Sequence, residues 1–170
     1  MVILISGTTH TGKTALSQRL MEKYRIPYFS IDHLKMGLIR SGKTSLTVND
    51  DEKLTPYLWS IVKEIIKTAI ENRQDLIIEG CYIPFDWQKD FDDSYLPNIR
   101  FYCLIMSAEY IENKFADVVK FGNIIENRIT TDIPNKAELI ADNTKNLQLC
   151  KAYGLEYILI DKTYNPDIAL

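Results

Sequence analysis

A short run near the start of the chain combines two glycines, a lysine and several hydroxyl side chains at fixed spacing. Gly7-Thr8-Thr9-His10-Thr11-Gly12-Lys13-Thr14 matches the pattern GxxxxGK[ST]. The glycines allow main-chain amides, up to that of Ala15, to curl around phosphate oxygens, and a helix beginning there adds its positive N-terminal dipole. Lys13 is placed to reach the β- and γ-phosphates, and the Thr14 hydroxyl to ligate magnesium. The run therefore predicts a site for a nucleoside triphosphate, in which His10 either touches phosphate or stays a solvated loop side chain.

A second stretch, Gly37 to Thr44, matches the same pattern without the surroundings that the mechanism needs. The residues before it are typical of a helix, and Leu38 and Ile39 stand where small polar residues would suit phosphate better. The residues from Thr47 to Asp51 are not expected to begin a helix. We interpret this match as a coincidence at the end of a helix.

The chemistry-bearing residues need strands and helices to position them. Short apolar runs predict buried strands at Val2–Ser6, Tyr28–Ile31, Leu76–Glu79, Arg100–Met106 and Tyr157–Ile160. Apolar residues at helical spacing predict a helix directly after the glycine run and further helices from Asp32 to about Ile39, at 108–121 and at 136–152. The stretch Ser41–Lys53 is expected to be a loop. A further helix, the longest, is expected to begin with Thr55 as N-cap and Pro56 in its first turn. This alternation predicts an α/β fold of the three-layer P-loop NTPase type, with a five-stranded, mainly parallel sheet and helices on both faces. Its ligands should bind at the carboxyl ends of the strands.

Residues 1 to about 34, together with Ile77-Ile78-Glu79-Gly80, resemble the small P-loop kinases. That group includes shikimate and gluconate kinases, chloramphenicol phosphotransferase, zeta-type toxins, nucleoside monophosphate kinases and proteins similar to 2-phosphoglycerate kinase. Over the rest of the chain the likeness is limited to the order of elements. The resemblance implies one domain over residues 1–170, with the P-loop strand in the middle of the sheet and a mobile helical lid at 108–134. It also implies ATP and Mg²⁺ as cofactors, and transfer of the γ-phosphoryl group to a hydroxyl of a small metabolite.

The resemblance assigns roles to two carboxylates. Ser30-Ile31-Asp32 stands where several of these kinases carry Asp-x-Asp, which implies that Asp32 contacts the acceptor hydroxyl, orients it and accepts its proton. Ser30 replaces the first acid, so a direct metal role for this segment loses support. Glu79 resembles the Walker B acid that anchors magnesium. Two alternatives stay open: Asp32 as the cap of the next helix, and Glu79 as an exposed carboxylate at a strand end.

Phosphoryl transfer also needs cations near the developing charge. Arg128 is the only arginine of the candidate lid, and the planar fork of arginine suits phosphate oxygens, so we predict that it clamps phosphate. Lys114 and Lys120 are the nearest other cations. Lys35 and Arg40 follow Asp32 on the predicted helix and could bind an anionic acceptor. For each of these side chains, a solvated surface charge is an equally good interpretation.

Composition limits the classes of function. The chain has 170 residues, of which 46% are hydrophobic and 25% charged, as in one globular domain with a core. A formal net charge of -3 gives no general attraction to nucleic acid or to an anionic membrane, and no apolar run approaches the length of a membrane span. Cys81, Cys103 and Cys150 lack metal-ligand spacing and are expected to be buried free thiols. We expect a cytoplasmic protein whose partners are a nucleoside triphosphate and a small-molecule acceptor.

Two other functions remain possible from the residues alone. In a nucleoside monophosphate kinase the acceptor would be a phosphate, and Arg40 could bind it, but Asp32 is less expected beside an anionic acceptor. An NTP-hydrolysing switch or binding module would signal through a partner instead. The guanine-binding pattern Asn-Lys-x-Asp is not found, because Asn135-Lys136 is followed by Ala137 and Glu138. The acceptor and the nucleotide base are not specified by any motif.

Overall fold

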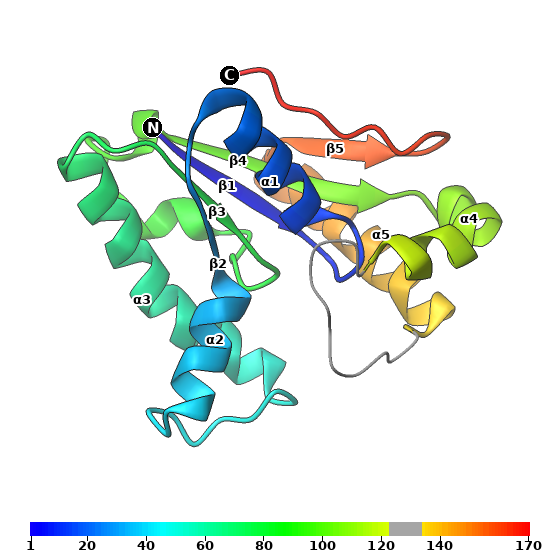
Figure 1. Ribbon diagram of the computed structural model, residues 1–170, viewed down its shortest axis with the longest axis horizontal. Coiled ribbons are helices and arrows are strands. Elements are labelled where there is room, and N and C mark those ends of the chain that lie inside the picture. Colours follow the sequence, from blue (N-terminus) through cyan, green and yellow to red (C-terminus); the bar gives the residue numbers. More distant parts are fainter. Residues whose placement is uncertain (123–133) are drawn as a thin grey trace.

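The computed structural model describes residues 1–122 and 134–170, which build a parallel sheet at the centre of the molecule (Figure 1). Its strands are β1 (Val2–Gly7), β2 (Tyr28–Ser30), β3 (Leu76–Glu79), β4 (Ile99–Met106) and β5 (Tyr157–Ile160). The order across the sheet is β2-β3-β1-β4-β5, and each of the pairings is parallel. The prediction that the strand before the glycine loop lies in the middle is confirmed.

Five α-helices connect and cover the strands in the described part of the chain. They are α1 (Lys13–Tyr24), α2 (Ile31–Arg40), α3 (Asp51–Glu71), α4 (Ala108–Phe121) and α5 (Lys136–Tyr153). Two short 3₁₀ turns, Trp87–Asp90 and Leu96–Asn98, lie between β3 and β4. Over the same described residues, none of the helices is both long enough and apolar enough to cross a bilayer.

The predicted start of α3 is wrong by about one helical turn. The helix begins at Asp51, inside the stretch 41–53 that we expected to be a loop. Thr55 does not cap it, since the Thr55 hydroxyl donates back to the carbonyl of Asp51 from within the helix (3.1 Å). Acidic residues at the first turn interact favourably with the positive end of the helix dipole, which explains the earlier start. Pro56 therefore lies inside the helix rather than in its first turn.

The second match to the glycine pattern, 37–44, does not follow a strand. Gly37 lies within α2, and the main chain turns after Ser41, with Gly42 in the left-handed region (φ 68°). The expectation that no helix begins between Thr47 and Asp51 is wrong, because α3 starts at Asp51. The absence of a preceding strand still supports the interpretation of this match as a coincidence.

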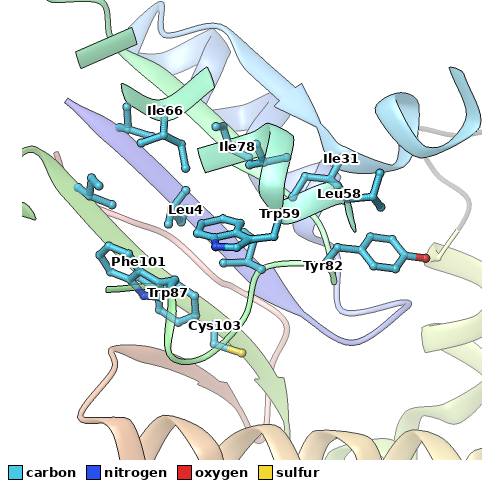
Figure 2. Close-up of a cluster of buried hydrophobic side chains, with 14 of the residues drawn as sticks. Leu4, Ile31, Leu58, Trp59, Ile66, Ile78, Tyr82, Trp87, Phe101 and Cys103 are labelled. Carbon is cyan, nitrogen blue, oxygen red and sulfur yellow. The ribbon is translucent and has the colours of Figure 1, made fainter. Parts of the chain in front are cut away.

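The two faces of the sheet are covered by different helices. Side chains alternate along β1, so that Ile3 and Ile5 pack on one face with Leu16 and Leu20 of α1. Leu4 points to the other face, where Figure 2 shows it among Trp59 of α3 and the aromatic residues that follow β3. The predicted three-layer α/β architecture is therefore confirmed.

The cysteines divide between the core and the surface. Cys103 of β4 and Cys150 of α5 are buried free thiols in the same core cluster, as expected. Cys81 is exposed, contrary to the prediction. It follows Gly80, at the point where the chain leaves the sheet, so its side chain does not enter the core.

Candidate active site

The glycine loop joins β1 to α1 in a turn that only glycine fits at two positions. Gly7 has φ 144°, and a Cβ there would lie 2.7 Å from the carbonyl oxygen of Leu104. Gly12 has φ 82° in the left-handed region and is the N-cap of α1. A Cβ on Gly12 would lie 1.7 Å from the Tyr164 hydroxyl oxygen. The strand, the turn and the helix N-terminus thus form the arrangement that the pattern predicts for binding phosphate.

Lys13 is held over the glycine loop. Its ammonium donates to the carbonyl oxygen of Thr8 at 2.7 Å, and its residue is only 7% exposed. The Thr11 hydroxyl donates to the same carbonyl at 2.8 Å. Among the described residues the hydrogen-bond partner of the Lys13 ammonium is thus a neutral carbonyl oxygen, which leaves its positive charge at the loop.

Thr14 and Glu79 form a pair at the carboxyl ends of β1 and β3. The Thr14 hydroxyl donates to Oε1 of Glu79 at 3.2 Å. Glu79 pairs in register with Ile5 on one side and Ser30 on the other, and it is 1% exposed. The alternative of an exposed surface carboxylate is therefore wrong. Burial raises the pKa of the Glu79 carboxyl, and the nearby charge of Lys13 opposes that rise.

This pair has the chemistry of a partial magnesium site. Within residues 1–122 and 134–170, no three or more His, Cys, Asp or Glu side chains gather in a way that could hold a metal on their own. Mg²⁺ is usually bound by one or two protein oxygens together with substrate phosphates and water. One hydroxyl and one buried carboxylate beside a phosphate loop fit that type of coordination.

Asp32 lies in the first turn of α2 and does not cap it. The N-cap is Ser30, whose side chain makes no capping hydrogen bond. The Asp32 carboxylate instead pairs with the ammonium of Lys35 at 2.7 Å. Glu79 pairs in register with Ser30, two residues before Asp32, and the charge of Asp32 contributes to the raised pKa of Glu79. The helix-cap interpretation of Asp32 is wrong.

Lys35 links Asp32 to two residues that the sequence analysis missed. The Lys35 ammonium donates to the hydroxyl oxygen of Tyr82 at 2.9 Å and lies 4.9 Å from the centroid of that ring. Tyr82 in turn donates to Oδ1 of Asp51 at 2.7 Å, at the start of α3. Burial and the adjacent Asp51 carboxylate raise the pKa of Tyr82 well above its usual value. We call Asp32, Lys35, Tyr82 and Asp51 the Asp32 cluster.

Signals for these two residues in the sequence were weak. Tyr82 is three residues beyond Glu79, in the segment that leaves the carboxyl end of β3, and that position is itself a hint. In Figure 2 the Tyr82 ring lies at the edge of the core cluster, near Leu58. Asp51 was hidden by the expectation of a loop over 41–53.

Asn143 of α5 contacts the glycine loop through a hydrogen bond to Thr8, and the sequence analysis did not predict this role. Asn143 is 1% exposed, accepts from the amide of Met106 at 2.8 Å, and donates to the Thr8 hydroxyl at 3.0 Å. It also donates to the carbonyl of Leu139 at 2.8 Å. An isolated asparagine in a helix is usually a surface residue, so the sequence offers no signal for this role.

A cavity of about 510 Å³ opens beside the glycine loop. Its lining comes from the loop, from α4 and from the segment after β5, and includes Gly12, Ala15, Met106, Tyr110, Val118 and Tyr164. The Tyr164 hydroxyl donates to the carbonyl of Thr11 at 3.2 Å. The segment after β5 is therefore in direct contact with the predicted phosphate site.

His10 also lines this cavity and is partly buried. It adopts φ 63°, and its Nδ1 lies 3.0 Å from the Thr9 hydroxyl oxygen. A Cβ on Gly122 would lie 2.1 Å from His10 Cδ2, so the ring packs against the end of α4. His10 is therefore partly buried between the glycine loop and α4, and its contact with phosphate stays a prediction.

The remaining predicted cations are not all brought to the site. Arg40 is exposed at the last residue of α2, about 12 Å along the helix axis from Asp32. Lys114 lines the cavity at a non-helical point inside α4. Arg128 and most of the second half of the candidate lid lie outside the described residues, so the lid and the arginine clamp stay predictions.

No protein-family profile and no curated protein matches this sequence. Solved structures nevertheless share its arrangement. A candidate kinase from Chloroflexus aurantiacus J-10-fl has a TM-score of 0.55 at 18% identity, over 96% of this chain and 88% of that one. This chain therefore shares its fold with that structure.

Two further structures agree. A sugar kinase from Janibacter sp. HTCC2649 has a TM-score of 0.54 at 15% identity, over 94% of this chain and 84% of that one. A gluconokinase from Sinorhizobium meliloti 1021 has a TM-score of 0.53 at 12% identity, over 97% and 83% of the two chains. At these identities the likeness establishes the fold, and function has to be argued from the site.

Proposed function

We propose that the protein is an ATP- and Mg²⁺-dependent kinase that transfers the γ-phosphoryl group to a hydroxyl of a small metabolite. The observation that carries this proposal is the hydrogen bond from Thr14, directly after the glycine loop, to the buried Glu79, which pairs in register with Ser30, two residues before Asp32. These neighbouring groups would supply a phosphate site, two oxygens for a metal and a carboxylate able to act on an acceptor, all at the carboxyl ends of adjacent strands. A protein that only binds nucleotide needs the first two and has no use for the third.

The glycine loop accounts for the nucleotide half of the reaction. Main-chain amides from Gly7 to Ala15 and the N-terminus of α1 would bind the phosphates, and Lys13 would stabilise the charge that develops on the transferred group. Thr14 and Glu79 would hold Mg²⁺, which neutralises charge on the β- and γ-phosphates when it is bound. Arg128 would add a second cation from the lid. The cavity lined by Tyr110 and Tyr164 has the apolar walls that suit a nucleotide base.

Asp32 accounts for the acceptor half. Its carboxylate would accept a hydrogen bond from the acceptor hydroxyl and orient its oxygen toward the γ-phosphorus. As the new O–P bond forms and the bond to the leaving ADP breaks, the hydroxyl proton passes to Asp32. Lys35 holds the carboxylate in place at 2.7 Å.

Substitution of Lys13 by alanine tests the proposal directly. We expect turnover to fall by about 10²-fold or more, because a cation aimed at the developing charge is lost. Mg-ATP should raise the Tm of the wild-type protein, and this rise should shrink in the variant. Lys23→Ala is the matched control, since Lys23 is exposed on the last turn of the same helix. Unchanged nucleotide binding and turnover in Lys13→Ala would show that the proposal is wrong.

A panel of metabolites separates a kinase from an NTP-hydrolysing switch. ADP release is measured with Mg-ATP alone and then with each candidate acceptor. A kinase releases ADP in an acceptor-dependent manner and yields a phosphorylated product. A slow hydrolysis rate that no acceptor changes would favour the switch.

A further inference from the structure

The Asp32 cluster has the opposite electrostatic character to the glycine loop beside it. It contains two carboxylates, Asp32 and Asp51, and a single ammonium, Lys35. From this arrangement we infer that the phosphoryl acceptor is a hydroxyl compound that carries neither a carboxylate nor a phosphate group. This inference rests on the proposed kinase function and narrows its substrate class.

Lys35 is already committed to partners within the protein. Its ammonium donates to the Asp32 carboxylate at 2.7 Å and to the Tyr82 hydroxyl at 2.9 Å, and its side chain is 14% exposed. It also lies over the Tyr82 ring at 4.9 Å. An anionic acceptor would have to compete for this ammonium with a carboxylate in direct contact. Lys35, which the sequence analysis assigned to an anionic acceptor, is therefore better described as the partner of Asp32.

The other sources of positive charge on α2 are also offset or exposed. The positive N-terminal end of α2 is offset by Asp32 in its first turn. His33 and Arg40, the remaining basic side chains of α2, are exposed, and Arg40 lies at the opposite end of the helix. The Tyr82 hydroxyl donates its proton to Asp51 and has none left to offer. An acceptor anion placed here would face Asp32 and Asp51, and like charges placed together disfavour binding.

The same groups suit a donor-rich acceptor. The Asp32 and Asp51 carboxylates have oxygen lone pairs that accept from O–H or N–H groups. Asp51 is exposed, so its second oxygen can be reached. Sugars, polyols and amine-bearing alcohols offer such donors without bringing a negative charge.

Three pools of acceptors, matched in size and number of hydroxyls, test the inference. One contains neutral sugars, polyols and nucleosides, one contains amino sugars and amino alcohols, and one contains hydroxy acids, sugar phosphates and nucleoside monophosphates. Wild-type protein that shows a Tm rise with Mg-ATP is incubated with radiolabelled ATP and each pool, and labelled products are separated. We expect products from the neutral or the amine-bearing pool, and none from the anionic pool.

The outcomes separate this inference from the proposed function. Products formed mainly in the anionic pool would agree with the proposed kinase function but would overturn the inference about the acceptor. No product in any pool, from protein that binds Mg-ATP, would overturn both. If Mg-ATP does not raise the Tm, the proposed kinase function itself is contradicted.

A charge-only variant tests the origin of the selectivity. Asp51→Asn keeps an oxygen that can accept from Tyr82 and removes one negative charge. The value of kcat/KM is measured for the best acceptor and for its carboxylate analogue. We expect the ratio of analogue to acceptor to rise about 2- to 5-fold in this variant. Glu52→Gln, at the exposed neighbouring residue, should leave the ratio unchanged. An unchanged ratio in Asp51→Asn would contradict the assignment of Asp51 to acceptor selection.

Discussion

Two lysines at the same edge of the sheet make similar contacts with different consequences. Lys13 lies 2.7 Å from the carbonyl oxygen of Thr8, and Lys35 lies 2.7 Å from the carboxylate of Asp32. A neutral carbonyl leaves the charge of Lys13 able to act on phosphate, whereas a carboxylate neutralises Lys35. Lysines at equal distances from oxygen therefore prepare one region for an anion and the other for an uncharged or cationic group.

The two regions also differ in how the chain assembles them. The glycine loop is continuous in sequence, so one strand, one turn and one helix are enough to form it. The Asp32 cluster takes residues from α2, from α3 and from the segment after β3. Substitutions in the two regions should therefore separate nucleotide binding from action on the acceptor.

The largest separation is expected from Asp32→Asn. Loss of the carboxylate that accepts the proton should lower the rate of transfer by about 10²- to 10⁴-fold. Affinity for Mg-ATP, measured by the Tm shift, should change little, because the glycine loop is intact. Asp93→Asn, at an exposed position, serves as control. An equal loss of transfer and of nucleotide affinity, with lower stability, would mean that Asp32 only supports the start of α2.

Glu79→Gln should lower turnover by about 10- to 100-fold, because an oxygen that orients or binds the metal loses its charge. The same variant should be more stable than the wild type at neutral pH when Mg²⁺ is absent. Burial raises the pKa of Glu79 in the folded state, so the folded protein binds this proton more tightly than the unfolded chain. The free energy of unfolding of the wild type therefore falls as the pH rises through the interval between the two pKa values.

The stability effect of Glu79→Gln is checked by Tm measurements across pH. The Tm difference between variant and wild type should be largest at neutral pH and should vanish at acidic pH, where Glu79 is protonated. Glu22→Gln, on the exposed face of α1, should show no such dependence. A variant that is less stable than the wild type at neutral pH would contradict the burial argument.

Asn143→Ala tests the support of the glycine loop. The substitution removes the acceptor of the Met106 amide and the donor to the Thr8 hydroxyl, at a cost of about 1–3 kcal/mol in the free energy of unfolding. Urea denaturation measures this change, and the Tm shift with Mg-ATP should shrink as well. The neighbouring Thr144→Ala, which removes an exposed hydroxyl that donates to the carbonyl of Ile140, should have a smaller effect. Equal effects in the two variants would show that Asn143 has no special role.

The smallest effect is expected from Tyr82→Phe. It removes the hydroxyl between Lys35 and Asp51, at about 1 kcal/mol in stability. It should lower kcat for the acceptor without changing nucleotide affinity, since Lys35 then holds Asp32 less firmly. Tyr95→Phe is a close control, because the Tyr95 hydroxyl also donates to a carboxylate of α3, Glu71 at the far end (2.6 Å). Similar kinetic effects in both variants would contradict a positioning role for Tyr82.

The sequence by itself determined the parallel α/β fold and which of the two glycine matches follows a strand and precedes a helix, while the central place of β1 was implied by the resemblance to small P-loop kinases. The first two features depend on local patterns, namely continuous apolar strands, helical spacing and glycines that no other residue can replace. The resemblance to small P-loop kinases also singled out Asp32 and Glu79, which follow or end predicted strands.

Only the tertiary structure decided what surrounds those residues. The burial of Glu79 beside Thr14, the support of Thr8 by Asn143, and the chain of contacts from Asp32 to Asp51 join residues that are distant in sequence. The tertiary structure also decided the hydrogen-bond partners of Lys13 and Lys35, although both residues are lysines on helices that follow a strand. Whether a lysine keeps its charge available depends on which oxygen the fold brings to it, and no local pattern records that.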